Sequence, residues 1–340
     1  MSRRPVAVSN AVLAAELEQV LSSTLGRETV CITDLRRKPL IYSSSTPIEE
    51  LEVSISGCLS LSLIFKDLSP SSLLYQARLA RPPFLRDPQR EIYVYRSVLP
   101  GLDAGTPRYY GDVSDEISGR YWLFVEPVNG VRLEQIGDFA VWEEAAAWLA
   151  RLHSKGTRLL AKMDPVGKEK LIRHNRSYYR RWLNRAKKAS EVRQGRDMGS
   201  WGLILSEYER SISELVSLPA TLLHGEFYPS NILVRDGVRE QICPVDWEMA
   251  SVGPALVDIA ALISGHWTES ERRRLVESYR SAACIPGLDL PRSFDSTLLI
   301  CRLHVAVQWL GWSLRWRPPP WHARNWLAEA TGLAESIAGG

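Results

Sequence analysis

The chain changes its hydrophobic period once, at residues 126–130, and this change limits its fold more than any other feature. On the N-terminal side, apolar and polar residues alternate through residues 51–55 and 59–65, a pattern typical of strands with one buried face. On the C-terminal side, apolar residues recur at helical spacing, and the proline and glycine of the segment between the two patterns interrupt regular structure. The sequence therefore predicts an α+β fold, with a β-rich N-lobe that contains one helix and a larger, mostly helical C-lobe. A first β-run is expected to open at residues 30–32, and the further expected strands are residues 51–55, 59–65, 107–113 and 121–125. The expected helices are residues 89–99, 142–153, 171–189 and 205–217.

The length of 340 residues is enough for two parts that each bury a core. The first apolar pattern contains Glu16 and Glu18, so it indicates an amphipathic helix and not the continuous apolar core of a signal peptide. We predict an N-terminal helix within residues 1–27, an N-lobe over residues 28–126, a C-lobe over residues 127–340, and a hinge at about residues 126–130.

Composition and charge exclude several classes of protein. The net charge of +3 is too small to indicate a nucleic-acid-binding protein, and no apolar run reaches the ~18 residues of a membrane span. The five cysteines are far apart and lack metal-ligand spacing, which favours reduced thiols and a cytoplasmic location. The composition alone does not predict an oligomeric state.

The densest polar cluster is residues 224–231, which read His-Gly-Glu-Phe-Tyr-Pro-Ser-Asn. A short hairpin is expected next, followed by Asp246-Trp247-Glu248. The hairpin would bring Asn231 and Asp246 to neighbouring strand ends, where two hard oxygen donors suit Mg²⁺. Glu226 would then lie beside the metal, able to orient an attacking hydroxyl or accept its proton.

This order of residues resembles the aminoglycoside phosphotransferase family. The pattern His-Gly-Glu-x-x-x-x-Asn followed by Asp-Trp-Glu is similar to the family's catalytic loop, usually His-Gly-Asp-x-x-x-x-Asn, and to its metal-binding loop. The resemblance covers roughly residues 28–335. It implies a two-lobed protein-kinase-like fold with a small antiparallel N-lobe sheet, with ATP as phosphate donor, Mg²⁺, and a small-molecule hydroxyl as acceptor. It also implies that His224 is a buried brace of the loop and that Asp258 supports the loops beneath the site.

The N-lobe contains candidates for the nucleotide site that this resemblance implies. Lys66 ends the expected third strand, where the fold places the lysine that neutralises the α- and β-phosphates, and Glu91 would pair with it. Backbone groups of the hinge, at Glu126 and Val128, would face the adenine. No Gly-x-Gly pattern is present, and the family's serine-rich alternative is represented by Ser43, Ser44 and Ser45, which can donate to phosphate oxygens.

Glu226 departs from the family's usual aspartate. The extra methylene moves the carboxylate by about 1.5 Å unless the backbone or rotamer compensates. A misplacement of about 1 Å can reduce a rate ~10²-fold, so a catalytically weak pseudokinase or nucleotide-binding module is the alternative interpretation. Lys66, Glu91, Asn231 and Asp246 all remain, which favours an active enzyme.

The C-terminal region predicts a less acidic acceptor pocket than a polycation requires. Residues 302–324 contain arginines and tryptophans but no Asp or Glu. If the tryptophans reach the cleft, the pocket suits a sugar ring or an aromatic natural product. If they pack into the core instead, they say nothing about the acceptor. Candidate acceptor residues are Tyr228, Glu248, Arg315 and Trp316.

Residues 173–196 form a strongly basic stretch with one acid, Glu191. A solvated helix face is its simplest explanation. The alternatives are an anionic acceptor or an RNA-binding module in which Tyr178, Tyr179 and Trp182 stack on bases, although a nucleic-acid partner is not expected for the whole chain.

Overall fold

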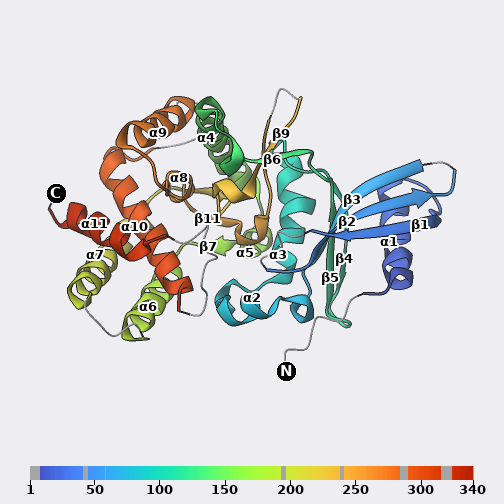
Figure 1. Cartoon of the computed structure of the whole chain (residues 1–340), viewed down its shortest axis with the longest axis horizontal. Helices are drawn as coiled ribbons and strands as arrows, with labels where there is room; N and C mark the ends of the chain where they lie inside the picture. Colours follow the sequence, from blue (N-terminus) through green and yellow to red (C-terminus); the bar gives the residue numbers. More distant parts are fainter. Residues whose placement is uncertain are drawn as a thin grey trace. The chain divides into compact units, whose positions relative to one another are not determined.

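The computed structural model describes residues 8–40, 45–57, 59–192, 197–237, 241–283, 290–314 and 324–339 (Figure 1). The chain divides into two compact units. The N-terminal unit comprises Met1–Gly130 with Arg235–Glu248, and the C-terminal unit comprises Val131–Val234 with Met249–Gly340. Asp246 therefore belongs to the same unit as the N-terminal sheet.

A five-stranded antiparallel sheet, in the order β1-β2-β3-β5-β4, forms the centre of the N-terminal unit. The hairpin between β2 and β3 turns at the predicted Ser56-Gly57, where Ile55 pairs with Leu59. Lys66 lies near the carboxyl end of β3. The strands are β1 Ile32–Pro39, β2 Ile48–Ile55, β3 Leu59–Asp67, β4 Tyr109–Asp115 and β5 Arg120–Val125.

The first strand begins at the end of the segment where the sequence predicted its start. The β-run was expected to open at residues 30–32, and the strand runs over Ile32–Pro39. This segment is rich in charge, so hydrophobic alternation does not reveal it. Its charged residues pair across the ladder with β2, through Arg37 with Glu49 and Lys38 with Glu50, which stabilises a solvated strand.

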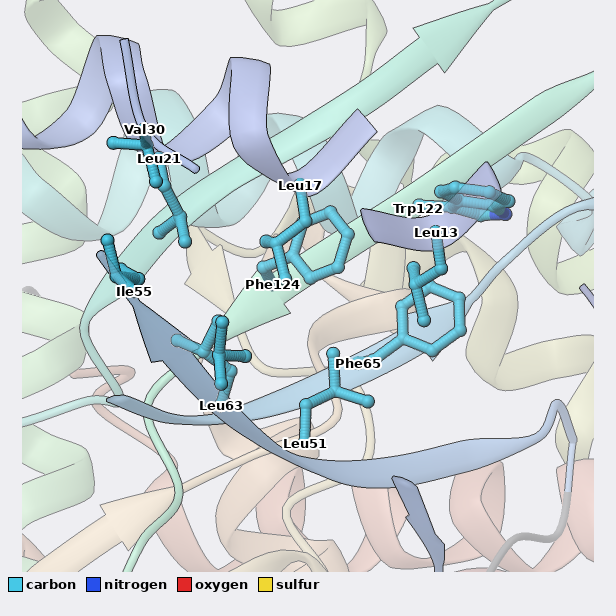
Figure 2. Close-up of a cluster of buried hydrophobic side chains, with 11 residues drawn as sticks. Leu13, Leu17, Leu21, Val30, Leu51, Ile55, Leu63, Phe65, Trp122 and Phe124 are labelled. Atoms are coloured by element: carbon cyan, nitrogen blue, oxygen red, sulfur yellow. The ribbon is translucent and has the colours of Figure 1, made fainter. Parts of the chain in front are cut away.

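Helix α1 (Asn10–Leu25) covers one face of this sheet. Ser9 caps its N-terminus by accepting from the backbone N–H of Val12, and Gly26 ends it in a left-handed conformation. Leu13, Leu17 and Leu21, spaced one helical turn apart, are fully buried. Figure 2 shows them against the side chains of the strands, among which Phe65 stacks on Phe124. This core holds β3, and therefore Lys66, in place.

Two short helices follow the sheet's third strand: α2 (Tyr75–Ala80) and α3 (Pro88–Tyr93). The helix expected over residues 89–99 is only partly α-helical. Asp87 caps α3, and the chain continues as a π-helical turn, Val94–Val98, and a 3₁₀ turn, Leu99–Gly101. The change occurs before Pro100, which cannot donate the backbone hydrogen bond that a regular helix needs.

The C-terminal unit is mostly helical, and its three-stranded sheet has the order β7-β11-β8. The helix expected over residues 171–189 begins later, at Arg176, because Ile172 and Arg173 form β7 and pair in parallel with β11. The helices are α4 Phe139–Lys162, α5 Pro165–Glu169, α6 Arg176–Val192, α7 Met198–Ser217, α8 Leu256–Leu262, α9 Glu269–Ala283, α10 Phe294–Trp312 and α11 Trp326–Ala338. The strands of this sheet are β7 Ile172–Arg173, β8 Ala220–Leu223 and β11 Ser251–Pro254. The other strands of the chain are β6 Gly130–Arg132, β9 Ile232–Arg235 and β10 Ile242–Pro244, of which β10 belongs to the N-terminal unit.

The aromatic residues of α6 face the interior. Tyr178, Tyr179 and Trp182 are each at most 5% exposed, so they are not available to stack on bases. This burial contradicts the stacking role predicted for these three side chains and agrees with a helix whose basic residues lie on its solvated face. Within the described part of the chain, no helix combines the length and the apolar character that crossing a bilayer requires.

Candidate active site

Lys66 and Glu91 form a buried ion pair in the N-terminal unit. Lys66 Nζ donates to Glu91 Oε1 at 2.6 Å, and the two side chains are 9% and 1% exposed. Strand β3 positions the lysine, and α3, capped by Asp87, positions the glutamate. The structure thus brings together the two residues that the sequence assigned to the phosphates.

Lys66 also contacts the Asp246 segment. Lys66 Nζ lies 2.9 Å from Asp246 Oδ1. Burial lowers the pKa of Lys66, but the carboxylates of Asp246, Glu91 and Glu248 outweigh it and raise that pKa above its ordinary value. Burial raises the pKa of Glu91, against the lowering effect of Lys66. The lysine therefore remains a full positive charge between carboxylates.

Asp246 has a backbone conformation that is rare for a residue with a side chain. Its φ is +67°, in the left-handed region. The next residue, Trp247, is fully buried, and its Nε1 donates to the carbonyl of Pro244 at 3.2 Å. Such conformations persist where the surroundings enforce them, and they concentrate at functional sites. The buried tryptophan and the bond to Lys66 together fix the direction of the Asp246 carboxylate, which stays 29% exposed.

Glu248, predicted as an acceptor residue, forms a largely buried ion pair with Arg81. Arg81 also donates to Ser45 Oγ at 3.0 Å, and Ser45 Oγ lies 3.5 Å from Glu248 Oε1. The backbone carbonyl of Glu248 accepts from Arg90 at 2.9 Å. Ser43 and Ser44 lie outside the described residues. Sequence reasoning missed Arg81, and no sequence signal links it to a residue 167 positions away.

The predicted hinge residue Glu126 follows β5 and is held by two basic residues. Its carboxylate accepts from Arg235 at 3.1 Å and from the backbone N–H of Arg108 at 2.9 Å. Burial raises the pKa of Glu126, but the bonds from Arg235 and Arg108 outweigh this effect and lower the pKa. Val128 lies in the irregular segment between β5 and β6.

Asp258 anchors the segment His224-Gly225 in the C-terminal unit. Its carboxylate accepts from the backbone N–H groups of His224 and Gly225, at 2.7 and 2.9 Å. His153 Nε2 lies 3.3 Å from the same carboxylate. Burial raises the pKa of Asp258, but the His153 bond, the charges of the two histidines and the backbone bond from Gly225 outweigh it and lower the pKa. Asp258 therefore remains an anion that fixes the loop's starting point.

The loop from Glu226 to Asn231 is tied together by its own hydrogen bonds. His224, fully buried, accepts from the backbone N–H of Glu226 through Nδ1 at 3.3 Å. The Asn231 side chain donates from Nδ2 to the Glu226 carbonyl at 3.1 Å. Phe227 is fully buried and stacks on Trp148, with ring centroids 5.7 Å apart. The loop thus buries Phe227 and leaves the side chain of Glu226 partly exposed.

Two tryptophans adjoin the loop at Tyr228. Trp309 Nε1 donates to the Tyr228 hydroxyl at 2.9 Å, and Trp309 stacks on Trp326 with centroids 5.2 Å apart. Trp309, one of the tryptophans of residues 302–324, and Trp326 therefore lie next to the candidate catalytic loop. Arg315 and Trp316, also predicted as acceptor residues, lie outside the described residues.

The candidate metal ligands fit Mg²⁺ by their chemistry. Asn231 uses its amide nitrogen within the loop, which leaves Oδ1 as its atom for a cation, and Asp246 supplies a carboxylate. No group of three or more His, Cys, Asp or Glu residues that could hold a metal occurs in the described ranges. Mg²⁺ does not need one, since it commonly binds one or two protein oxygens together with substrate phosphates and water.

Three solved structures with the same architecture are distant from this chain in sequence. A mutant of aminoglycoside 2'-phosphotransferase-IIIa in complex with GDP is 14% identical, with a TM-score of 0.55 over 96% of this chain and 97% of that one. A microcompartment-associated aminopropanol kinase is 17% identical, with a TM-score of 0.56 over 89% and 90%. Choline kinase from Streptococcus pneumoniae is 13% identical, with a TM-score of 0.57 over 97% and 100%. At these identities the similarity establishes the fold, and it confirms the predicted protein-kinase-like class.

Family assignment rests on the sequence. No curated protein matches the chain closely enough to count as a relative. The family model APH, described as the phosphotransferase enzyme family, matches residues 75–294, which is more than half of the chain and includes both polar loops. The chain therefore belongs to the phosphotransferase enzyme family, as its His-Gly-Glu and Asp-Trp-Glu segments predicted.

Proposed function

We propose that this phosphotransferase moves the γ-phosphoryl group of ATP to a hydroxyl of a small molecule, with Mg²⁺ as cofactor. The observation that carries the proposal is the position of Lys66, whose ammonium is bonded to both Glu91 and Asp246. In a phosphotransferase, a lysine fixed by a glutamate neutralises the nucleotide phosphates. The kinases of known structure that share this fold include ones named for small molecules, aminopropanol and choline.

The remaining candidate residues take the following roles in the proposal. Asn231 and Asp246 hold Mg²⁺, which neutralises charge on the phosphate oxygens when bound. Glu226 orients the acceptor hydroxyl and receives its proton, while the acceptor oxygen bonds to the γ-phosphorus and the bond from that phosphorus to the β–γ bridging oxygen breaks. Ser45, with Ser43 and Ser44, contacts the phosphates. Backbone groups at Glu126 and Val128 bind the adenine.

Replacing the metal-binding carboxylate tests this proposal. Asp246→Ala should abolish MgATP turnover and leave the fold intact, because the carboxylate is partly exposed and Lys66 keeps its ion pair with Glu91. Asp236→Ala is the matched control, since Asp236 is an exposed aspartate in the neighbouring hairpin turn. The measurement is ADP release with a panel of sugars, amino alcohols and natural-product alcohols. Undiminished turnover in Asp246→Ala would refute the assignment.

One observation favours a second candidate, a pseudokinase that binds nucleotide without transferring phosphate. It is the glutamate at position 226, where the family usually has aspartate. In that case no acceptor would increase ADP release, whereas MgATP would still raise the melting temperature. ADP release with any acceptor would exclude this candidate.

A further inference from the structure

Three arginines from separate elements of the C-terminal unit lie together with few carboxylates. Arg272 is on α9, Arg302 on α10, and Arg324 just before α11. Their side chains are 15–18% exposed. The three side chains are therefore largely buried, but part of each is still accessible to a ligand.

The carboxylates near these arginines are too few to neutralise their three positive charges. Arg324 forms an ion pair with Glu329, and the same glutamate is the nearest carboxylate to Arg302, at 3.8 Å, which is beyond hydrogen-bond distance. Arg272 pairs with Glu269, whose side chain is 72% exposed. Among the residues that the structure describes, a single buried carboxylate thus serves two of the three guanidinium groups.

Hydrogen bonding leaves part of the cluster unsatisfied. The Nε atoms of Arg272 and Arg302 are buried without a partner in the described part of the chain. Arg324 donates to the carbonyl of Gly265 at 3.3 Å, and Arg272 lies at 3.5 Å from that of Trp267. Burial lowers the pKa of Arg302, and the charge of Arg272 lowers it further, so the guanidinium groups repel one another. Buried charge of this kind is costly unless an anion offsets it.

The cluster adjoins the candidate catalytic loop through aromatic residues. The Arg324 guanidinium lies over the Trp326 ring, 4.4 Å from its centroid. Trp326 stacks on Trp309, which donates to Tyr228, two residues beyond Glu226.

We infer that Arg272, Arg302 and Arg324 bind an anionic group of the acceptor, a carboxylate or a phosphate. Guanidinium forks bind both groups through paired, charge-assisted hydrogen bonds. The aromatic residues Tyr228, Trp309 and Trp326 would contact the acceptor's apolar part. This inference rests on the proposed function, since it takes the molecule bound beside Glu226 to be the acceptor. It predicts that a polycation is repelled from this site.

Direct binding measurements test the inference without requiring phosphate transfer. The probes are 4-(2-hydroxyethyl)benzoate, the corresponding phosphonate, and the corresponding uncharged amide, titrated calorimetrically into the full chain. The anionic probes should bind at least ~10-fold more tightly than the amide. The preference between carboxylate and phosphonate distinguishes the two anion types. Equal affinity for the amide and both anions would overturn the inference.

Matched variants locate the binding. Arg302→Gln should weaken anion binding ~10- to 100-fold and leave amide binding unchanged. The control is Arg273→Gln, which replaces an exposed arginine next to Arg272 on α9 and should change neither affinity. Glu329→Gln should have the opposite effect and strengthen anion binding several-fold, because it removes the competing carboxylate. A purely structural ion pair would not produce that gain. Should Arg302→Gln fail to fold, Arg302→Lys and Glu329→Gln decide the question, and unchanged anion affinity in both would refute it.

The outcome is separable from that of the proposed function. Binding that depends on Arg302, without ADP release from any alcohol, would uphold the anion site and refute the phosphotransferase proposal for these acceptors. ADP release with neutral or cationic alcohols, without anion binding, would uphold the phosphotransferase proposal and refute the anion site.

Discussion

Lys66 Nζ donates to Asp246 Oδ1 at 2.9 Å, so the third strand of the sheet is bonded to a segment 180 residues further along the chain. The same ammonium is bonded to Glu91 at 2.6 Å. One lysine therefore connects the strand, helix α3 and the Asp246 segment within the N-terminal unit. Its removal should affect both stability and nucleotide binding, and the two effects can be separated.

Lys66→Met should lower stability by about 3–5 kcal/mol, because it leaves Glu91 buried without its partner. Lys66→Met/Glu91→Leu should recover much of this loss, since apolar residues can replace a buried ion pair. Neither variant should turn over MgATP at more than a few per cent of the wild-type rate. Urea unfolding with steady-state kinetics measures both effects. Full activity in the stabilised double variant would contradict the role given to Lys66.

Glu226→Gln keeps the side chain's shape but removes its charge. We expect kcat to fall by ~10²–10⁴, with little change in nucleotide affinity. Glu226→Asp should lose less activity than Glu226→Gln, because the carboxylate remains but withdraws from the acceptor, while the buried Phe227 holds the loop in place. Kinetics of the three proteins with one working acceptor decide this. A wild-type rate in Glu226→Gln would mean that the residue has no catalytic role.

Gly225 allows the loop to turn next to the chain that follows Trp247. Its φ is +87°, and a Cβ atom there would clash with the backbone carbonyl of Met249. Gly225→Ala should therefore cost more than the roughly 1–3 kcal/mol of conformational strain alone, and activity should fall. Gly57→Ala is the control, since Gly57 has a φ of +90° and nothing within 4 Å of the added Cβ. Equal melting temperatures for the two variants would contradict the close approach to Met249.

His174 should make stability depend on pH. Burial lowers its pKa to about 4, although Asp258 raises it, and the ring stacks on Tyr178 with centroids 4.2 Å apart. The unfolded chain, with a histidine pKa near 6.5, binds the proton first, so this stability is full above pH 6.5 and is lost as the pH falls towards 4. The loss reaches about 3 kcal/mol.

His174→Phe keeps the stacking but removes the titration. Urea unfolding at pH 7 and pH 4.5 should show a smaller decrease for this variant than for the wild type, by roughly 2–3 kcal/mol. Asp258, whose pKa is also lowered, destabilises both proteins on acidification. Identical pH dependence would contradict a neutral, buried His174.

Local patterns predicted the parts of the molecule whose partners are near in sequence. The Ser56-Gly57 turn and the amphipathic helices follow from hydrophobic period and turn residues, and the family resemblance led to Lys66, Glu91 and the loop at residues 224–231. Elements that pair with segments distant in the sequence were not predicted correctly. Residues 172–173 continue a helical pattern but pair as a strand with β11, and a charged strand, β1, carries no alternation.

The environment of individual side chains was the least predictable part of the site. Helical spacing does not distinguish Trp182, which is fully buried, from Trp309, which adjoins Tyr228. The absence of acids in residues 302–324 indicated a basic region, but Arg272 joins it from another helix. Such convergence depends on the tertiary arrangement of the helices, which no local pattern contains.

Transfer of phosphate from ATP to a hydroxyl is the activity that we propose for this chain. Its most direct test is ³¹P nuclear magnetic resonance of the protein with ATP, Mg²⁺ and the alcohol panel, including the hydroxyalkyl benzoate. We expect a new phosphomonoester signal that appears as ATP is consumed, and that is absent in Asp246→Ala and after removal of Mg²⁺ with a chelator. ATP that remains intact with every acceptor, while still raising the melting temperature of the protein, would contradict it.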